Sequence, residues 1–118
     1  MHTIIAGDLN SRVGSVEGVF SDTDYQLNPD QIVNRHGKIL RDTCEANSKY
    51  FLLNGYSCRE KIFDSKYTFY RGPLRSQVDI ALSNNVQQND SFSIIDKVIY
   101  SDHCPFVISC SIPIPFLL

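Results

Sequence analysis

Polar side chains that could carry chemistry stand at the ends of three apolar runs. They are Asp8 and Asn10, then Asp79, and finally Ser101, Asp102 and His103. Because alternate residues of a strand point to the same side, Asp8 and Asn10 direct a carboxylate and an amide toward one place. A histidine beside an acid can be held in one tautomer and kept charged near neutral pH. Acids for a divalent cation and a water, a histidine, and an amide for an anionic oxygen together indicate metal-assisted phosphoryl hydrolysis.

Each cluster also has a purely structural interpretation. The first pair can cap the turn that follows a strand. Asp79 can pair with an arginine such as Arg75. Asp102 can cap the turn before Pro105, which leaves His103 as an ordinary polar residue. The chemical interpretation is favoured because all three clusters occur together, in this order, each at the end of an expected strand.

The elements that must position these clusters follow from hydrophobic periodicity. A short buried strand is expected at residues 3–6, followed by a long polar loop at 11–33. Apolar residues at helical spacing predict a surface helix over 34–47. Further strands are expected at 49–55, 66–72 and 76–85, an extended run at 93–103, and a last strand at 104–112. This order predicts one domain of α/β (α+β) class with a mostly antiparallel sheet.

Composition limits the function classes. An apolar fraction of 42% is typical of a globular chain, and a net charge of -2 does not announce a nucleic-acid or membrane binder. Residues 59–75 nevertheless carry a local excess of basic side chains, which suits phosphates, although a solvated loop is the commoner explanation. The four cysteines form no C-x-x-C pair, and no secretory signal or membrane-spanning run is evident. We therefore expect reduced thiols, an intracellular protein and no membrane partner.

Four short motifs, taken in order, resemble those of a known superfamily. "GDLN", "YTF", "QVDIAL" and "SDHCP" resemble the ordered motifs of the endonuclease/exonuclease/phosphatase superfamily. The longer stretches 33–57 and 67–85 look like the endonuclease domain that precedes the reverse transcriptase in non-LTR retrotransposons. The resemblance runs from about residue 4 to about residue 109. It implies Mg²⁺- or Mn²⁺-dependent hydrolysis of DNA, a nuclear location, and a parent protein that also carries a reverse transcriptase domain.

The resemblance implies catalytic roles for individual positions. Asp8 resembles the acid that orients or deprotonates the attacking water. Asn10 resembles the amide that hydrogen-bonds the scissile phosphate. Asp79 resembles the acid that hydrogen-bonds the catalytic histidine, and His103 resembles that histidine, which contacts the phosphate and stabilises charge in the transition state.

Further positions are implied to bind the metal, the phosphate or the DNA. Thr68, in "YTF", matches a hydroxyl position near the phosphate or near the acid network. Asp102 resembles an acid at or near the metal. Arg71 and Arg75, in the basic segment, are candidate contacts to the DNA backbone.

One part of the family pattern is missing. In the family a metal-binding glutamate lies well before "GDLN", and the glutamates here (Glu17, Glu45 and Glu60) stand in other contexts. The resemblance therefore implies the C-terminal half of a four-layered α/β/β/α sandwich over residues 1–118, with the N-terminal half of the domain as a missing partner. We expect weak Mg²⁺ binding and a chain that is inactive, or nearly so, by itself. Two alternatives stay open: a non-catalytic relic or interaction module that keeps the fold, and a phosphomonoesterase of the same superfamily.

Overall fold

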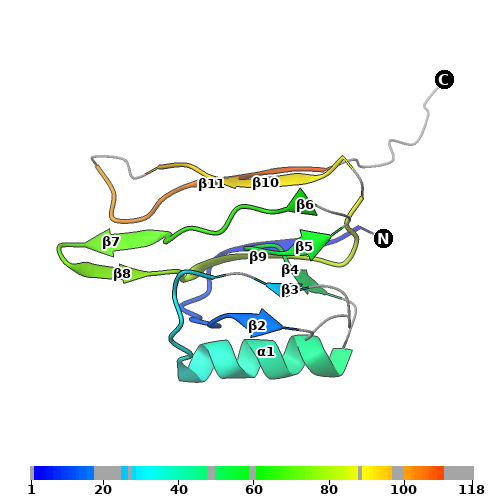
Figure 1. The fold of residues 1–118 in the computed structure, drawn as a ribbon, viewed down its shortest axis with the longest axis horizontal. Helices are drawn as coiled ribbons and strands as arrows, with labels where there is room; N and C mark the ends of the chain where they lie inside the picture. The colour runs from blue at the N-terminus through cyan, green and yellow to red at the C-terminus, as the bar shows by residue number, and fades with distance from the viewer. Residues whose placement is uncertain are drawn as a thin grey trace.

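The computed structural model describes residues 2–17, 25–26, 28–47, 50–58, 61–87, 89–96 and 100–110. At its centre is an antiparallel sheet in which β9 (Asp79–Ser83) lies between β1 (Ile4–Asp8) and β4 (Phe51–Leu52), as Figure 1 shows. All residues of β9 are buried, as expected for a central strand. The pairing aligns Asp8 with Asp79, so the two acids lie opposite each other where the sheet ends.

A helix, α1 (Arg35–Asn47), packs on one face of this sheet. Asn34 caps the helix, because its side-chain oxygen accepts the N–H of Gly37 at 2.7 Å. Leu40 and Cys44 point inward and join a core that includes buried residues of β4 and β9. Most of the remaining helix surface is exposed, as a narrow apolar stripe predicts. Within the described ranges, no helix is long and apolar enough to cross a bilayer.

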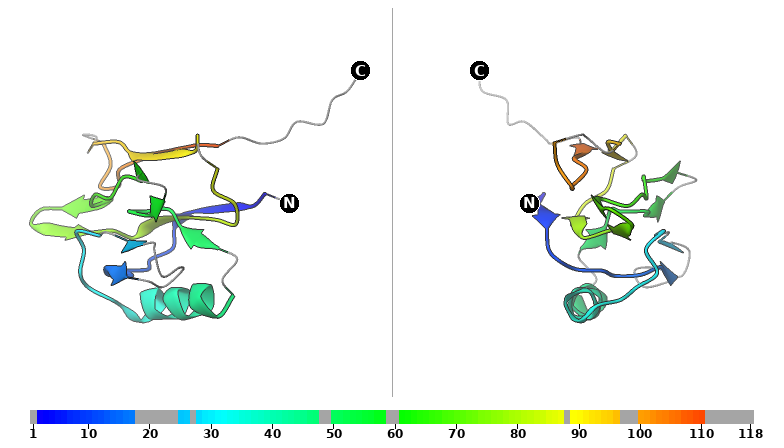
Figure 2. Two further views of the ribbon diagram at one scale, coloured as in Figure 1. Left: turned by 45° about the vertical axis from the view of Figure 1, so that its right-hand side comes forward. Right: turned by 90° about the vertical axis from the view of Figure 1, so that its left-hand side faces the viewer.

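A two-stranded ribbon lies on the other side of the sheet. Its strands, β10 (Ser91–Ile94) and β11 (Phe106–Ser109), pair antiparallel. Figure 2 shows this ribbon on the side that faces away from α1. A second core fills the space between the ribbon and the sheet, and its buried members are Leu53, Tyr56, Phe63, Ala81, Phe92, Ile94 and Cys104. Because Ala81 belongs to β9, this strand contributes to the cores on both sides.

Three further strand pairs complete the described structure. They are β2 (Val16–Glu17) with β3 (Tyr25–Gln26), β5 (Ser57–Cys58) with β6 (Lys61–Ile62), and β7 (Phe69–Arg71) with β8 (Leu74–Ser76). The β7–β8 hairpin projects from the body of the molecule (Figure 1). It turns at Gly72, whose φ of 56° is a conformation that glycine adopts without the steric cost of a side chain.

The structure confirms the class of the fold and changes the detail of several strands. The strand expected to be buried over 3–6 is β1, which runs to Asp8 and is partly exposed, and the loop expected over 11–33 contains β2 and β3. The helix expected over 34–47 is present, and every strand pair in the described residues is antiparallel. The strand expected over 76–85 is present as β9 and is shorter, because Ser76 belongs to the end of β8 and residues 77–78 lie between the two strands. Of the extended run expected over 93–103, only the first two residues belong to a strand, because β10 ends at Ile94. Residues 97–99 of that run lie outside the described part of the chain. The fold is α+β, while the half of a four-layered sandwich stays a prediction.

Candidate functional site

Three of the predicted residues meet where β1 and β9 end. Nδ1 of His103 lies 2.8 and 3.1 Å from the two carboxylate oxygens of Asp79, and Nε2 of His103 lies 3.8 Å from a carboxylate oxygen of Asp8. Because carboxylate oxygens only accept hydrogen bonds, Nδ1–H donates to Asp79, and Nε2 faces Asp8. The side chain of Asp79 is 10% exposed, against 40% for His103 and 52% for Asp8. The cluster therefore opens to solvent on the Asp8 side.

His103 reaches this place through contacts with β7. Phe69 and His103 form an isolated antiparallel bridge, and the N–H of Tyr70 donates to the carbonyl of Asp102 at 2.8 Å. The rings of Phe69 and His103 meet edge to face, with their centroids 5.1 Å apart. A backbone bridge, an aromatic ring and the Asp79 carboxylate thus fix the imidazole together.

Thr68 supports Asp79 from the interior. Its side chain is fully buried, and its hydroxyl oxygen accepts the N–H groups of Val78 and Asp79, both at 3.1 Å. The N–H of Cys104 donates to the carbonyl of Thr68 at 2.7 Å, so Thr68 links β9 to the segment that carries His103. This is the acid network, one of the two positions that the motif implied for Thr68. A direct contact between Thr68 and a phosphate stays a prediction.

Asp8 and Asn10 form the turn that leaves β1. The N–H of Asn10 donates to the carboxylate of Asp8 at 2.9 Å, which is the capping bond of the structural interpretation. Asn10 has a φ of 49°, a left-handed conformation that asparagine tolerates better than most residues. The residue is exposed, so its amide stays accessible two positions from Asp8. Capping and a role in the site are therefore compatible.

Protonation of His103 offsets one of the two negative charges of the cluster. Asp8 and Asp79 are like charges paired directly across two strands, an arrangement that costs stability. The hydrogen bond to Asp79 raises the pKa of His103, partial burial acts in the opposite direction, and the charges of Asp79, Asp8 and Asp102 raise it further. Because the net direction is upward, the structure favours an imidazolium between the two acids.

The same three side chains fit a divalent cation. One ligand atom from each of Asp8, Asp79 and His103 lies within 4.8 Å of the others. Carboxylates suit Mg²⁺ and Mn²⁺, whereas an imidazole suits transition metals such as Zn²⁺. A proton on His103 competes with a metal, because only a neutral imidazole is a ligand. The donor set admits a metal ion without selecting its identity.

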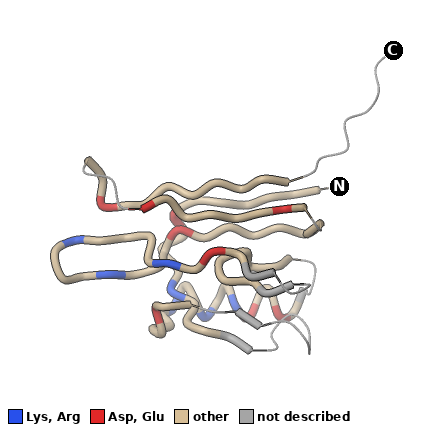
Figure 3. Tube along the Cα trace, turned by 45° about the horizontal axis from the view of Figure 1, so that its top comes forward, with Lys and Arg blue, Asp and Glu red and all other residues tan. Residues whose placement is uncertain are grey.

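Asp102, the predicted metal ligand, lies next to this group and is paired elsewhere. One of its carboxylate oxygens is 3.1 Å from Nε of Arg71. The guanidinium groups of Arg71 and Arg75 lie over aromatic rings of the β7–β8 hairpin. Figure 3 shows basic positions along this projecting hairpin. The structural interpretation in which Asp79 pairs with Arg75 is not the arrangement seen. The guanidinium of Arg75 lies over the ring of Tyr70, and the carboxylate of Asp79 accepts a hydrogen bond from His103.

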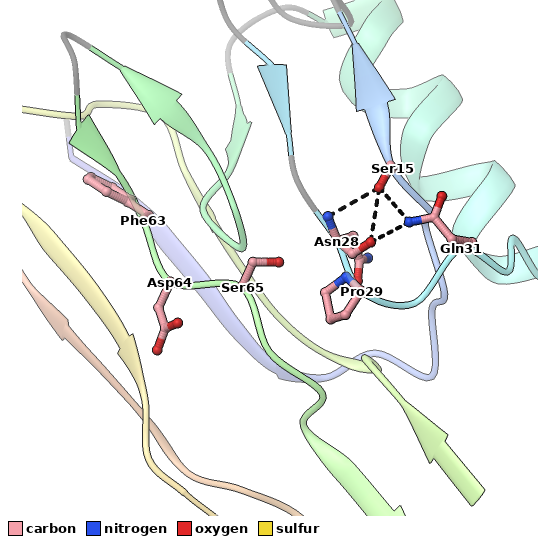
Figure 4. Close-up of a pocket in the computed structure, with 7 residues that line it drawn as sticks. All are labelled: Ser15, Asn28, Pro29, Gln31, Phe63, Asp64 and Ser65. Atoms are coloured by element: carbon pink, nitrogen blue, oxygen red, sulfur yellow. Dashed lines mark hydrogen bonds between the residues drawn. The ribbon is translucent and has the colours of Figure 1, made fainter.

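A separate pocket of about 520 Å³ lies between the loop before α1 and residues 63–65. Figure 4 shows its lining residues: Ser15, Asn28, Pro29, Gln31, Phe63, Asp64 and Ser65. The hydroxyl of Ser15 bonds the backbone of Asn28 and accepts from the side-chain amide of Gln31. Because these polar groups bond one another, they stabilise the loop, and we assign the pocket no ligand.

The sequence did not indicate Arg12 and Asp30, which hold the segments next to the cluster in place. Arg12 and Asp30 form a bidentate ion pair, and the N–H of Gln77 donates to Asp30 at 3.0 Å. Both charged residues belong to the expected loop over 11–33. Its length was a signal, because long loops in compact domains are often functional. Nothing in the spacing of its residues singled out these two.

Comparison of the chain with protein-family models, with curated proteins and with solved structures finds no match. A functional assignment therefore depends on the sequence motifs and on the geometry of the cluster.

Proposed function

We propose that this chain carries the acid–histidine part of a phosphodiesterase site that hydrolyses DNA with a divalent cation, Mg²⁺ or Mn²⁺. The observation that carries the proposal is the cluster of Asp8, Asp79 and His103, which come from three distant parts of the sequence. A histidine fixed by one buried carboxylate and facing a second, exposed carboxylate supplies both a proton donor and an acceptor at one place. Acid–base chemistry on a phosphate needs that combination.

The geometry suggests a role for each side chain. With Nδ1 held by Asp79, the Nε2–H of His103 is free to donate to a phosphoryl oxygen as negative charge builds there. The exposed carboxylate of Asp8 accepts a hydrogen bond from an attacking water, and the amide of Asn10 donates to a second phosphoryl oxygen. A divalent cation held by carboxylate oxygens of this group and of Asp102 would neutralise part of the phosphate charge, while His103 keeps its proton.

The β7–β8 hairpin supports a polynucleotide as the substrate. Arg71 and Arg75 are exposed on it, and a DNA backbone presents many phosphates for such side chains. If Arg75 contacts one phosphate, Arg75→Ala weakens DNA binding and lowers the slope of log affinity against log salt concentration by about 1. An unchanged slope removes Arg75 from the proposed DNA surface.

The direct test is nicking of supercoiled plasmid DNA by the polypeptide that carries this chain. We expect nicking that needs Mg²⁺ or Mn²⁺ and stops with EDTA. His103→Ala and Asp79→Asn should each lower the rate on the order of a hundredfold or more. Asp42→Asn is the matched control, because it removes an exposed acid on α1 that pairs with Lys38. Nicking that persists without His103 rejects the role assigned to it.

Two measurements separate the alternatives. Calorimetric titration of the chain with Mn²⁺ should show binding that Asp8→Asn weakens. A folded chain that does not bind the metal at millimolar concentration, carried in a polypeptide that does not nick DNA, is the non-catalytic module. Hydrolysis of a phosphomonoester without nicking of DNA identifies the phosphomonoesterase instead.

A further inference from the structure

Asp30 is a buried carboxylate in the segment before α1, outside the cluster described above. It accepts Nε–H and Nη–H bonds of Arg12, each at 2.8 Å, the N–H of Gln77 at 3.0 Å and the N–H of Ile32 at 3.2 Å. A carboxylate offers about four acceptor positions, so the acceptor capacity of Asp30 is filled. Charge-assisted and bidentate bonds of this kind are among the strongest in proteins. Asp30 is therefore a fixed point in the interior.

Two of these donors belong to the segments that carry the two acids of the cluster. Arg12 follows Asp8 by four residues, and Gln77 precedes Asp79 by two. The register of β1 and β9 ends at Asp8 and Asp79, with one more backbone hydrogen bond of 3.1 Å beyond that pair. Asp30 thus links the segment that follows β1 to the segment that precedes β9, at the point where the backbone pairing of the two strands has ended.

Side-chain oxygens hold three consecutive backbone N–H groups on the approach to β9. Asp30 accepts from Gln77, and Thr68 accepts from Val78 and Asp79. Gln77 itself is fully buried, and its side-chain amide donates to a backbone carbonyl at 2.8 Å. The direction in which the chain enters Asp79 is therefore set by side chains, and it is sensitive to their loss.

The chain that leaves Asp8 is held in a similar way. Asn34 donates to the carbonyl of Asn10 at 3.0 Å and accepts the N–H of Arg12 at 3.0 Å. Arg12 is thus fixed through its backbone by Asn34 and through its guanidinium by Asp30. A displacement of Asp30 would therefore move both the segment after Asp8 and the segment before Asp79.

We propose that Asp30 is a positioning residue for the cluster: it fixes the separation of Asp8 and Asp79, and with it the place of His103 between them. Asp30 contacts none of the three and acts through Arg12 and the backbone of residue 77. The geometric consequence, the fixed separation of the two acids, does not depend on what the cluster does. The catalytic consequence, correct placement of the acids for phosphodiester hydrolysis, rests on the function proposed above.

The test is Asp30→Asn, which keeps the size of the side chain and removes its charge and one acceptor. The readout is the NMR signal of Nδ1–H of His103, identified by its loss in His103→Gln. In the unaltered chain, the bond to Asp79 moves this signal downfield and slows its exchange with water. In Asp30→Asn we expect an upfield shift and severalfold faster exchange. An unchanged signal in a folded Asp30→Asn chain overturns the proposal.

Two more variants distinguish positioning from a general loss of stability. Ile94→Val makes a small cavity in the ribbon core, to which Asp30 does not belong, and should leave the signal unchanged. An equal shift in Ile94→Val rejects the proposal. If Asp30→Asn does not fold, Arg12→Lys replaces the bidentate contact by a single one and keeps the charge. A smaller shift in the same direction supports the proposal, and no shift overturns it.

Activity adds a second readout where nicking is observed. Misplaced reacting groups slow the chemical step more than they weaken binding, so Asp30→Asn should lower kcat by about tenfold to a hundredfold with little change in KM. An equal kcat rejects the catalytic consequence. Failure of the unaltered polypeptide to nick DNA rejects the proposed function instead, and the NMR result still decides the geometric inference.

Discussion

At the scale of single residues, the site depends on hydrogen-bond acceptors that are hidden from solvent. The catalytic candidates Asp8 and His103 are partly exposed, but the groups that aim them are buried. Thr68 is the clearest case, because one hydroxyl oxygen accepts two backbone N–H groups. Thr68, Val78 and Asp79 are all buried, so loss of the hydroxyl leaves those N–H groups without their acceptor.

Thr68→Val tests this arrangement, because valine keeps the shape of threonine without the hydroxyl. The N–H groups of Val78 and Asp79 then stay buried and unpaired, at a cost of about 1–3 kcal/mol each. We expect the free energy of unfolding, measured with urea, to fall by about 2–6 kcal/mol. Thr68→Ser keeps the oxygen and removes one methyl group, for a loss of about 1 kcal/mol. Equal losses in the two variants contradict the role assigned to the hydroxyl.

At the scale of elements, helix α1 and the turn after β1 are packed backbone to backbone. A Cβ atom placed on Gly37 overlaps the carbonyl oxygen of Arg12. The cap residue Asn34 also bonds the backbone of Asn10 and of Arg12. The start of α1 is therefore one wall of the turn that carries the site, and its glycine is required by the close approach.

Gly37→Ala tests this packing. Helix propensity alone would predict that the substitution stabilises the protein, whereas the packing predicts that it destabilises it. Alanine is favoured over glycine inside a helix by about 1 kcal/mol. Here the added methyl group must displace a backbone carbonyl, so we expect the free energy of unfolding to fall by about 2–3 kcal/mol. Thr43→Ala, at an exposed position of the same helix, is the control and should gain a few tenths of a kcal/mol. A stabilised Gly37→Ala chain means that the helix start is not packed on this carbonyl.

The sequence predicts elements that depend on local signals and misses those that depend on distant partners. Helix α1 is predictable because its apolar spacing and its cap residue lie within the segment itself. The break between β8 and β9 is not, because the N–H groups of residues 77–79 bind side chains at positions 30 and 68. The same holds for the site. Ordered motifs indicate Asp8, Asp79 and His103, whereas Asp30 is one acid within a polar loop.

At the scale of the whole molecule, two small cores lie on opposite sides of one sheet. The helix side and the ribbon side each bury a handful of apolar side chains, and β9 contributes to both. A chain of this length buries a modest share of its surface, so its stability is a small difference between large terms. A single buried polar network can therefore decide whether the whole chain is folded at a given pH.

Asp30 makes one such pH-dependent contribution. Burial opposes its ionisation, but the hydrogen bond from Arg12, those from the backbone of Gln77 and Ile32, and the charge of Arg12 outweigh burial and lower the pKa of Asp30. The unfolded chain regains the ordinary value of about 3.9. The contribution is therefore present above that value and is lost as the pH falls through the lower pKa of the folded state.

Urea unfolding between neutral and acidic pH measures this contribution. We expect the free energy of unfolding of the unaltered chain to fall steeply below about pH 4. Asp30→Asn should be less stable at neutral pH by about 1–3 kcal/mol. It should then lose less on acidification, because it has no carboxylate to protonate at this position, so the two curves converge. Asp42→Asn removes an exposed acid, should change stability by no more than about 0.5 kcal/mol, and should run parallel to the unaltered chain. A parallel curve for Asp30→Asn means that another acid controls unfolding at low pH.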